Sequence, residues 1–383
     1  MAGLIVHEWI EKRGGSENVV EEMARTFPDA AIRCLWNDAP ERFPSRTVVE
    51  SWMASTPLRH SKVAAMPLMP ITWALTDVSE MDFVLVSSHL FAHHVGGRMP
   101  AYGPRKFVYV HTPARYIWAS QFDHRGRNLL ARVASPFLKG IDKYRANQGA
   151  MFAANSEFVK DRIRLLWDQD ATVIYPPVDV SRIRSVDRWE DHLTPVDEAT
   201  LAGLPREFVL GASRFVPYKQ LDLVIRAGES AGLPVVLAGS GPQRAELAAV
   251  AASASVPVFI VDGPSDELLY ALYQAALVFV FPAIEDFGIM PVEAMSLGTP
   301  TLVSSAGGAK ESVLALSGGA LIESSDEASL KRGIDDALAS DMSHAVRTAD
   351  ATFGAKSFSR RLLNWMGPQD AAGPRPSIAP AGF

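Results

Sequence analysis

The chain has 383 residues and a formal net charge of −6, with 48% hydrophobic and 21% charged residues. This length exceeds the size at which one hydrophobic core stops growing, so we expect two domains of about 180 residues each. The composition excludes a disordered chain, and no apolar run approaches the roughly 18 residues of a membrane-spanning helix. A single cysteine, Cys34, excludes an internal disulfide and a thiolate metal cluster. Acidic residues directly follow the first apolar run, unlike in a signal peptide, so we expect a cytoplasmic protein.

A glycine pair near the N-terminus is the first candidate for a ligand site. A buried strand is expected at residues 4–6 and an amphipathic helix at 19–27, with Gly14 and Gly15 in the loop between them. A strand, a glycine-rich loop and a helix can hold phosphate groups at backbone N–H groups. A plain tight turn remains the alternative, because two glycines alone are weak evidence.

The first half continues with alternating strands and helices. The clearer strands are expected at 30–35, 63–66, 83–87, 107–110 and 151–155. This alternation predicts a doubly wound α/β sheet. His111 directly follows a strand, at the edge where such sheets bind ligands, and is therefore a candidate site residue. An ordinary surface or core histidine is the alternative.

The second half carries two cations in one loop. Arg214 and Lys219 follow a strand expected at residues 208–212. Two cations at this place fit a diphosphate whose leaving-group charge is stabilised without a metal ion. A solvated loop is the alternative interpretation of the pair.

The next strand, at 235–238, is followed by a pattern that imitates a dinucleotide fingerprint. Gly239 and Gly241 open the loop, and Asp262 ends the following strand. Arg244 stands where the third glycine of that fingerprint would allow close helix–strand contact. A nicotinamide-dependent oxidoreductase is therefore kept only as a remote alternative.

The stretch 276–311 holds two glutamates eight positions apart. A buried strand at 277–281 leads through Glu285 into a helix whose first turn is expected to carry Glu293. A helix start binds anions, and a carboxylate beside it can accept hydrogen bonds from a vicinal diol such as ribose. The alternative is that Glu285 is a solvated loop residue and Glu293 an ordinary helix acid.

Together, these segments resemble retaining glycosyltransferases of family 4, which use nucleotide sugars. The resemblance rests on the Glu-x7-Glu pair, the cationic loop, the segment YVHTPARYIW at 109–118 and the turn GGAKE at 307–311. It implies the GT-B fold, an α/β architecture of two facing Rossmann-like domains with an interdomain cleft. The expected parts are an acceptor-binding domain at 1–183, a linker at 184–206, a donor-binding domain at 207–350, a C-terminal helix at 351–366 that packs back on the first domain, and a disordered tail at 367–383.

The resemblance also implies residue roles. The catalytic residues would be His111, which faces the donor sugar, Glu285, Arg214 and Lys219. Glu293 would hold the donor ribose. The other donor-binding residues would be Gly14, Gly15, Gly263, Pro264, Asp286, Phe287, Gly288, Ile289 and Met290. Related mannosyltransferases commonly carry an acid after the tryptophan of the histidine segment, where this chain has Ala119.

The expected reaction transfers mannose from GDP-mannose to an acceptor alcohol, with a UDP-sugar donor as the alternative. A non-catalytic module that binds sugar nucleotides is a different class of function that the same fold allows. We expect no metal and no cofactor, because no cluster of carboxylates or histidines has ligand spacing. No nucleic-acid partner is expected, since no nucleic-acid motif is present.

A basic segment suggests contact with a membrane. Residues 102–164 contain twelve Lys and Arg against four Asp and Glu. Such basic residues interleaved with apolar ones are typical of a helix that lies on an anionic membrane surface. They are Arg125, Arg127, Arg132, Lys139, Lys143 and Arg145, around Leu129, Leu130, Val133, Phe137, Leu138 and Ile141. This surface would receive a lipid-diphosphate-linked saccharide at the cytoplasmic leaflet. A solvated helix with a buried apolar face is the alternative.

Overall fold

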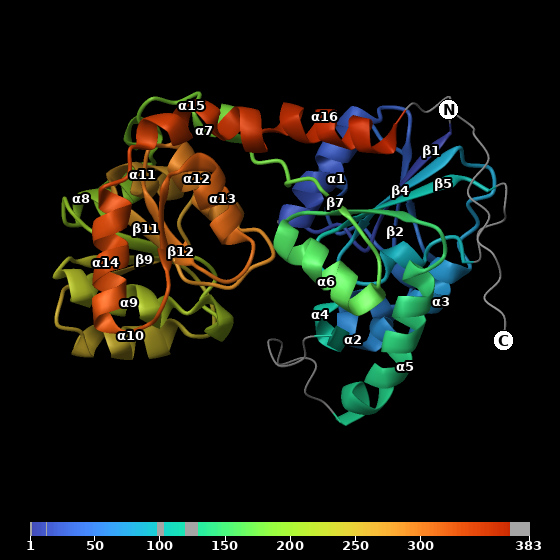
Figure 1. Ribbon diagram of the computed structural model, residues 1–383, viewed down its shortest axis with the longest axis horizontal. Coiled ribbons are helices and arrows are strands. Elements are labelled where there is room, and N and C mark those ends of the chain that lie inside the picture. The colour runs from blue at the N-terminus through green and yellow to red at the C-terminus, as the bar shows by residue number, and fades with distance from the viewer. Residues whose placement is uncertain (1, 13, 98–102, 119–128, 368–383) are drawn as a thin grey trace. The chain divides into compact units, whose positions relative to one another are not determined.

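The computed structural model describes residues 2–12, 14–97, 103–118 and 129–367. The chain forms two compact units, one from Met1–Pro177 together with Phe358–Phe383, the other from Val178–Ser357 (Figure 1). Each unit is built around one parallel sheet with helices on its faces. Ala119, Arg125 and Arg127 lie outside the described residues, as does all of the expected tail except Gly367.

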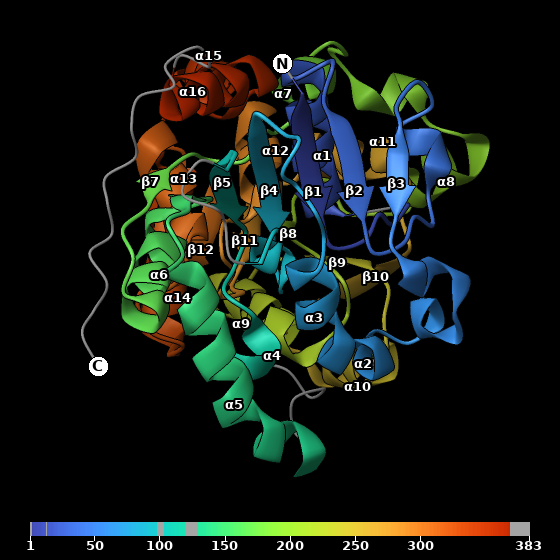
Figure 2. The ribbon, with the colours of Figure 1, turned by 90° about the vertical axis from the view of Figure 1, so that its right-hand side faces the viewer.

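The first unit contains a seven-stranded sheet in the order β3-β2-β1-β4-β5-β6-β7, and Figure 2 shows the strands from β3 to β5 side by side in this order. Its strands are β1 (Gly3–His7), β2 (Ala31–Cys34), β3 (Val48–Glu50), β4 (Phe83–Ser88), β5 (Arg105–Val110), β6 (Met151–Ala154) and β7 (Thr172–Val173). All neighbouring strands pair in parallel. Their carboxyl ends therefore meet at one edge of the sheet.

Side chains of the first sheet enter two cores because successive strand residues point to opposite faces. Leu4 and Val6 of β1 belong to one core and Ile5 to the other. Both faces are thus buried, which explains why these strands are continuous apolar runs. The helices of this unit are α1 (Gly15–Thr26), α2 (Lys62–Ala65), α3 (Met69–Ala74), α4 (Arg115–Trp118), α5 (Leu129–Ala146) and α6 (Glu157–Trp167).

A fully buried carboxylate, that of Asp142 in α5, joins several of these helices. Its Oδ2 accepts hydrogen bonds of 2.7 Å from the indole N–H groups of Trp118 and Trp167. Its Oδ1 lies 3.1 Å from His93 Nε2 and 3.2 Å from His94 Nε2. Burial alone would raise the pKa of the Asp142 carboxyl, but the two histidines hold that pKa below its ordinary value. The charge is therefore satisfied inside the core, as a buried ion requires.

The second unit contains a six-stranded parallel sheet in the order β10-β9-β8-β11-β12-β13. Its strands are β8 (Val209–Ala212), β9 (Val235–Gly239), β10 (Val258–Asp262), β11 (Val278–Phe281), β12 (Thr301–Ser304) and β13 (Gly319–Ile322). Its helices are α7 (Val180–Ile183), α8 (Pro195–Ala202), α9 (Leu221–Ala231), α10 (Arg244–Ser253), α11 (Asp266–Ala275), α12 (Ile289–Ser296), α13 (Ala309–Leu316), α14 (Glu327–Leu338) and α15 (Met342–Phe353). The doubly wound α/β architecture expected from the sequence is confirmed in both units.

The prediction of a strand at residues 63–66 in the first unit is wrong. Residues 63–66 are not a strand, because Ser61 caps α2 by accepting a hydrogen bond from Ala64 N at 3.3 Å. The strand beside β2 is β3, three residues long. Short apolar runs do not distinguish the two structures by periodicity alone.

The stretch expected to be a linker, 184–206, instead belongs to the second unit. It contains the 3₁₀ helix η8 (Trp189–His192) and α8. Trp189 is buried, its ring centroid lies 4.8 Å from that of Tyr270, and its backbone N–H donates to the side chain of Gln274 at 2.8 Å. A buried tryptophan anchors this polar stretch, so the first unit ends at Pro177 rather than at residue 183.

The last helix, α16 (Ala355–Met366), returns the chain to the first unit. Its residues Phe358, Leu362 and Met366 are buried in the core that also contains Ile5. This spacing of four residues places the three side chains on one face of the helix. The expected C-terminal helix therefore contributes to the core of the first unit.

Candidate functional site

Two neighbouring loops of the second unit bring the predicted cation and carboxylate into contact. Lys219 lies in the 3₁₀ helix η9 (Pro217–Lys219) after β8, and Glu285 follows β11, the next strand of the sheet. Lys219 Nζ forms an ion pair with Glu285 Oε1. Lys219 is buried, and its Nζ also lies 5.3 Å from the ring centroid of Phe281. A cation is thus held in a fixed place at the carboxyl edge of the sheet.

Arg214, the second predicted cation, is exposed. It lies in the same loop as Lys219, and its guanidinium donates a 2.8 Å hydrogen bond to the hydroxyl of Tyr218. That single contact leaves most of its donor groups able to bind an anion. The loop therefore offers one buried and one exposed cation.

The acidic loop after β11 lies against the predicted glycine turn. Gly308 N–H donates to the backbone oxygen of Glu285 at 2.7 Å, and Gly307 has a φ of +90°. A Cβ on Gly308 would overlap the backbone oxygen of Asp286. Phe287 is buried, its ring centroid 5.6 Å from that of Phe353. The two glycines are needed because the two backbones approach closely.

Glu293 lies deeper in its helix than expected. The helix α12 begins at Ile289, after Gly288 with a φ of +92°, so Glu293 is outside the first turn. Its Oε2 accepts a long hydrogen bond of 3.5 Å from the hydroxyl of Tyr273 in α11. Burial, with a contribution from the negative charge of Asp266, raises the pKa of Glu293 to about 7. An underpartnered carboxyl of this kind is ready to accept hydrogen bonds from a ligand.

The residues that imitate a dinucleotide fingerprint are explained by packing and by an ion pair. Arg244 forms an ion pair with Asp262, with Arg244 Nε 3.1 Å from both carboxylate oxygens. A Cβ on Gly241 would lie 2.6 to 2.9 Å from backbone atoms of Phe215, and one on Gly239 would overlap Ser213 O. These glycines therefore allow two loops to touch. The acid that a ribose would need is already paired, which argues against the oxidoreductase.

Gly263 and Pro264 form the loop before α11. Gly263 has a φ of +56° and donates its N–H to Gly239 O at 2.8 Å. Ser265 caps α11 by accepting from Leu268 N at 3.1 Å. Capping accounts for the serine, and a contact of this loop with a nucleobase stays a prediction.

In the first unit, His111 is held on both its backbone and its side chain. Its N–H donates to Ser88 O at 2.8 Å, and its carbonyl accepts from the side chain of Asn155 at 3.0 Å. Its Nε2 is hydrogen-bonded to Ser87 Oγ at 2.8 Å. Burial, followed by the charges of His89 and His7, lowers the pKa of His111 well below its ordinary value. This histidine is therefore a neutral imidazole at the carboxyl end of β5.

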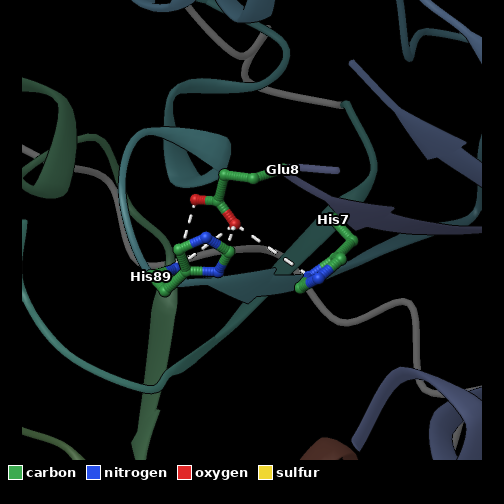
Figure 3. A group of neighbouring side chains, drawn as sticks. All are labelled: His7, Glu8 and His89. Carbon is green, nitrogen blue, oxygen red and sulfur yellow. Dashed lines mark hydrogen bonds and ion pairs between the residues drawn. The ribbon is translucent and has the colours of Figure 1, made fainter. Parts of the chain in front are cut away.

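His7, Glu8 and His89 form a cluster beside His111 that the sequence prediction missed (Figure 3). Glu8 Oε2 lies 3.2 Å from His89 Nδ1 and 4.0 Å from His7 Nδ1, while Glu8 Oε1 accepts from the backbone N–H groups of Leu90 and Ala92. Burial alone would raise the pKa of the Glu8 carboxyl, but the histidines and these N–H groups hold it below its ordinary value. Glu8 is thus an ionised carboxylate that fixes the loop after β4.

The sequence shows no cluster of carboxylates or histidines with ligand spacing, but the fold brings such side chains together, and the expectation that no metal is needed stays a prediction. Two such groups occur among the described residues, one at His7, Glu8 and His89, the other around Asp142. Hydrogen bonds already occupy several of the possible ligand atoms. His7 Nδ1 also faces the backbone oxygen of Ser87 at 3.2 Å, and both oxygens of Asp142 have partners. The pairing of β1 with β4 brings Glu8 beside residues about 80 positions away, and α5 brings Asp142 to His94, 48 positions away, so sequence spacing gave no signal for either group.

The glycine pair near the N-terminus starts α1. Gly14 has an extended backbone, and α1 begins at Gly15, earlier than the expected residue 19. Glu17 in its first turn is buried and accepts hydrogen bonds from Glu11 N at 3.2 Å and Ser16 Oγ at 2.8 Å. This carboxylate compensates the helix dipole and disfavours a second anion close by. A role of the two glycines in diphosphate binding stays a prediction.

Comparison with protein families matches both halves of the chain. Residues 13–182 match the model described as Glycosyltransferase Family 4, and residues 197–352 match the model described as Glycosyl transferases group 1. A GDP-mannose-dependent alpha-(1-6)-phosphatidylinositol monomannoside mannosyltransferase from Mycolicibacterium smegmatis is 30% identical over 357 residues, which cover 88% of each chain. The chain belongs to glycosyltransferase family 4.

Other members of the family match over a shorter range. The D-inositol 3-phosphate glycosyltransferase from Mycobacterium sp. strain JLS is 31% identical over 252 residues, covering 59% of this chain and 55% of that protein. The chain thus spans about half the length of this relative. Anabaena HepE in complex with UDP has a TM-score of 0.68 at 19% identity and covers 96% of this chain and 99% of its own. This likeness confirms the GT-B fold.

The raised pKa of Glu293 gives a test of its environment without a ligand. The pKa of about 7 lies above the ordinary 4.5, so the folded protein binds a proton more tightly than the unfolded chain does. The stability contributed by this proton is complete below pH 4.5 and is lost as the pH rises to about 7. Glu293→Gln should therefore raise Tm more at pH 8 than at pH 5.

The measurement is thermal unfolding of both proteins without ligand at the two pH values. Glu267→Gln, which also removes an acid from the second unit, is the matched control and should show no such pH-dependent gain. Equal changes in Tm at pH 5 and pH 8 for Glu293→Gln would show that its charge is not penalised in the folded state.

Proposed function

We propose that this protein is a retaining glycosyltransferase that transfers a hexose from a nucleotide sugar to an acceptor alcohol. The observation that carries the proposal is the contact between Lys219 and Glu285 at the carboxyl edge of the second sheet, with Arg214 in the same loop. Ligands bind at this edge in open α/β sheets. The family membership of the whole chain supports the same reaction.

The two cations would stabilise the diphosphate that leaves the donor sugar. An ammonium has three N–H groups, and Lys219 uses one for Glu285, so two remain for phosphate oxygens. Arg214 would add donors from the exposed side of the loop. Charge stabilisation by preorganised groups is among the largest contributions to catalysis, and here it would replace a metal ion.

Retention of configuration would proceed by attack on the face that the phosphate leaves. The acceptor oxygen would form its bond to the anomeric carbon while the bond to the diphosphate breaks, and a phosphate oxygen would take the acceptor proton. Among the residues that the structure describes, we identify no carboxylate nucleophile for a double displacement other than Glu285, and its ion pair with Lys219 lowers its nucleophilicity. Glu293 would accept hydrogen bonds from the donor ribose, and His111 would contact the donor sugar.

The donor proposed is GDP-mannose. The Mycolicibacterium smegmatis relative, which matches most of the chain, is a GDP-mannose-dependent enzyme by name. The Anabaena neighbour was solved with UDP and UDP-glucose, so a UDP-sugar remains the competing donor. The segment around His111 favours the mannosyl donor by its resemblance to mannosyltransferases.

A donor screen with a metal chelator tests the reaction. GDP and GDP-mannose should raise Tm more than UDP, ADP and their sugars, because at equal concentration the ligand that binds more tightly stabilises the folded protein more. Mannose release or transfer from GDP-mannose should persist in EDTA. Binding without turnover would identify a non-catalytic module, and loss of turnover in EDTA that Mg²⁺ restores would contradict the metal-independent mechanism.

Kinetics of site variants test the assigned roles. Lys219→Ala should lower kcat by about 10²-fold or more, the scale for a preorganised charge stabiliser. Glu285→Gln and His111→Ala should also act on kcat, because contacts at the reacting sugar can strengthen in the transition state. Glu293→Gln should act mainly on KM, because ribose contacts are shared by both states. Equal changes of kcat and KM in all variants would overturn these assignments.

For the acceptor, we propose a lipid-linked saccharide that α5 helps to reach at an anionic membrane surface. None of the helices within the described residues has the length and apolarity to cross a bilayer. On α5, Phe137 and Tyr144 are 73% and 63% exposed, and Lys143, the residue before Tyr144, is exposed as well. Leu138 instead packs against the core. The described part of α5 thus offers two aromatic side chains and a cation to a surface.

Vesicle sedimentation tests this surface. Phe137→Ser with Lys143→Ser should weaken binding to vesicles of anionic lipid, and binding of the unaltered protein should fall with added salt. Arg164→Ser with Leu165→Ser is the matched control, because it also removes an exposed cation and an exposed apolar side chain, from α6. Equal binding to neutral and anionic vesicles, or none to either, would favour a soluble acceptor.

A further inference from the structure

A chain of hydrogen bonds runs through the first unit from His7 to His111. Ser87, near the carboxyl end of β4, lies between them, since β1 and β5 are the two neighbours of β4 in the sheet. His7 Nδ1 lies 3.2 Å from Ser87 O and 3.1 Å from Ser87 Oγ. Ser87 Oγ lies 2.8 Å from His111 Nε2. His7 and Ser87 are fully buried, so each of these groups must find its partner within the protein.

The direction of the first bond follows from the carbonyl. A carbonyl oxygen only accepts, so the close approach of His7 Nδ1 to Ser87 O requires a hydrogen on Nδ1. Burial lowers the pKa of His7, and a neutral ring then has a bare Nε2. That Nε2 is buried and has no partner among the described residues. An unpaired acceptor costs less than an unpaired N–H, which agrees with this tautomer.

The direction of the second bond follows from the hydroxyl. Ser87 Oγ carries one hydrogen, and its neighbours among the described residues are His7 Nδ1 and His111 Nε2. The first already carries a hydrogen, so it cannot accept. The Ser87 hydroxyl must therefore donate to His111 Nε2. If His111 Nε2 carried a hydrogen instead, the hydroxyl hydrogen would be buried without an acceptor, which is unfavourable.

We propose that Ser87 and His7 are positioning residues that hold neutral His111 in the tautomer with its proton on Nδ1. The side chain of His111 then presents an N–H donor, and its basic nitrogen is turned into the protein. His111 would act as a hydrogen-bond donor to an oxygen of the substrate, not as a general base. This consequence for the reaction rests on the proposed glycosyl transfer, whereas the tautomer itself does not.

The tautomer is measured directly by NMR of the protein labelled with ¹⁵N in its histidine rings. The two ring nitrogens of a neutral imidazole have different shifts according to which one carries hydrogen. The His111 signals are identified by their loss in His111→Asn. We expect a protonated Nδ1 and a bare Nε2 for His111 in the protein without ligand, and the opposite pattern would overturn the proposal.

Variants of Ser87 test the positioning role. Ser87→Ala should move His111 to a mixture of tautomers, and Ser87→Thr, which keeps the hydroxyl, should keep the single tautomer. Ser88→Ala removes the next buried hydroxyl of β4, which bonds Glu8 and His93, and is the matched control. It should leave the His111 signals in place. Unchanged His111 signals in folded Ser87→Ala would show that Ser87 does not set the tautomer.

Kinetics then test the consequence. The amide N–H of an asparagine lies near the position of a histidine Nδ1, whereas that of glutamine reaches the position of Nε2. His111→Asn should therefore keep at least tenfold more kcat than His111→Gln, with similar KM. Equal kcat values would overturn the donor role. If the unaltered protein turns over no nucleotide sugar, the proposed function fails. The NMR measurement still decides the tautomer of His111.

Discussion

The constraint on which this structure depends is the parallel direction of every strand in both sheets. Parallel strands end at one edge, so residues that follow different strands become neighbours whatever their separation in the chain. His7, His89 and His111 follow or end three adjacent strands of the first sheet, and Lys219 and Glu285 follow two adjacent strands of the second. The chemistry of each unit is therefore concentrated where its strands end.

Buried charges hold these edges in a fixed arrangement. Asp142, Glu8 and Lys219 are each removed from water, and each has charged or polar partners on another segment. Removing one partner of such a group typically costs several kcal/mol, because the remaining charge stays buried. The partners of Glu8 and Lys219 thus join the loops that follow paired strands, whereas those of Asp142 join helices. Asp142 in particular connects α5 to Trp118, the last residue of the segment 109–118 that contains His111.

Much of the fold and part of the site were predictable from the sequence. The apolar run of β11 consists of β-branched and aromatic residues and is buried along its whole length, so it predicts a strand. The carboxyl-edge rule that singled out His111 applies equally to His7 at the end of β1 and to Glu8 directly after it, so both could have been predicted. Asp142 was not, because an acid inside a basic segment gives no sign of burial. The strand predicted at residues 63–66 was wrong because a run of four apolar residues fits a helix as well as a strand.

The contact between the acidic loop and the glycine turn has a consequence for how such a protein can evolve. Gly307 and Gly308 meet the backbone of Glu285 and Asp286, so this contact contains no side chain from the turn. Side chains of either segment that take no part in the ion pair of Glu285 can be exchanged by mutation while the two backbones keep their separation. Under selection for a new substrate, such side chains can therefore change while the two glycines preserve the contact between the backbones.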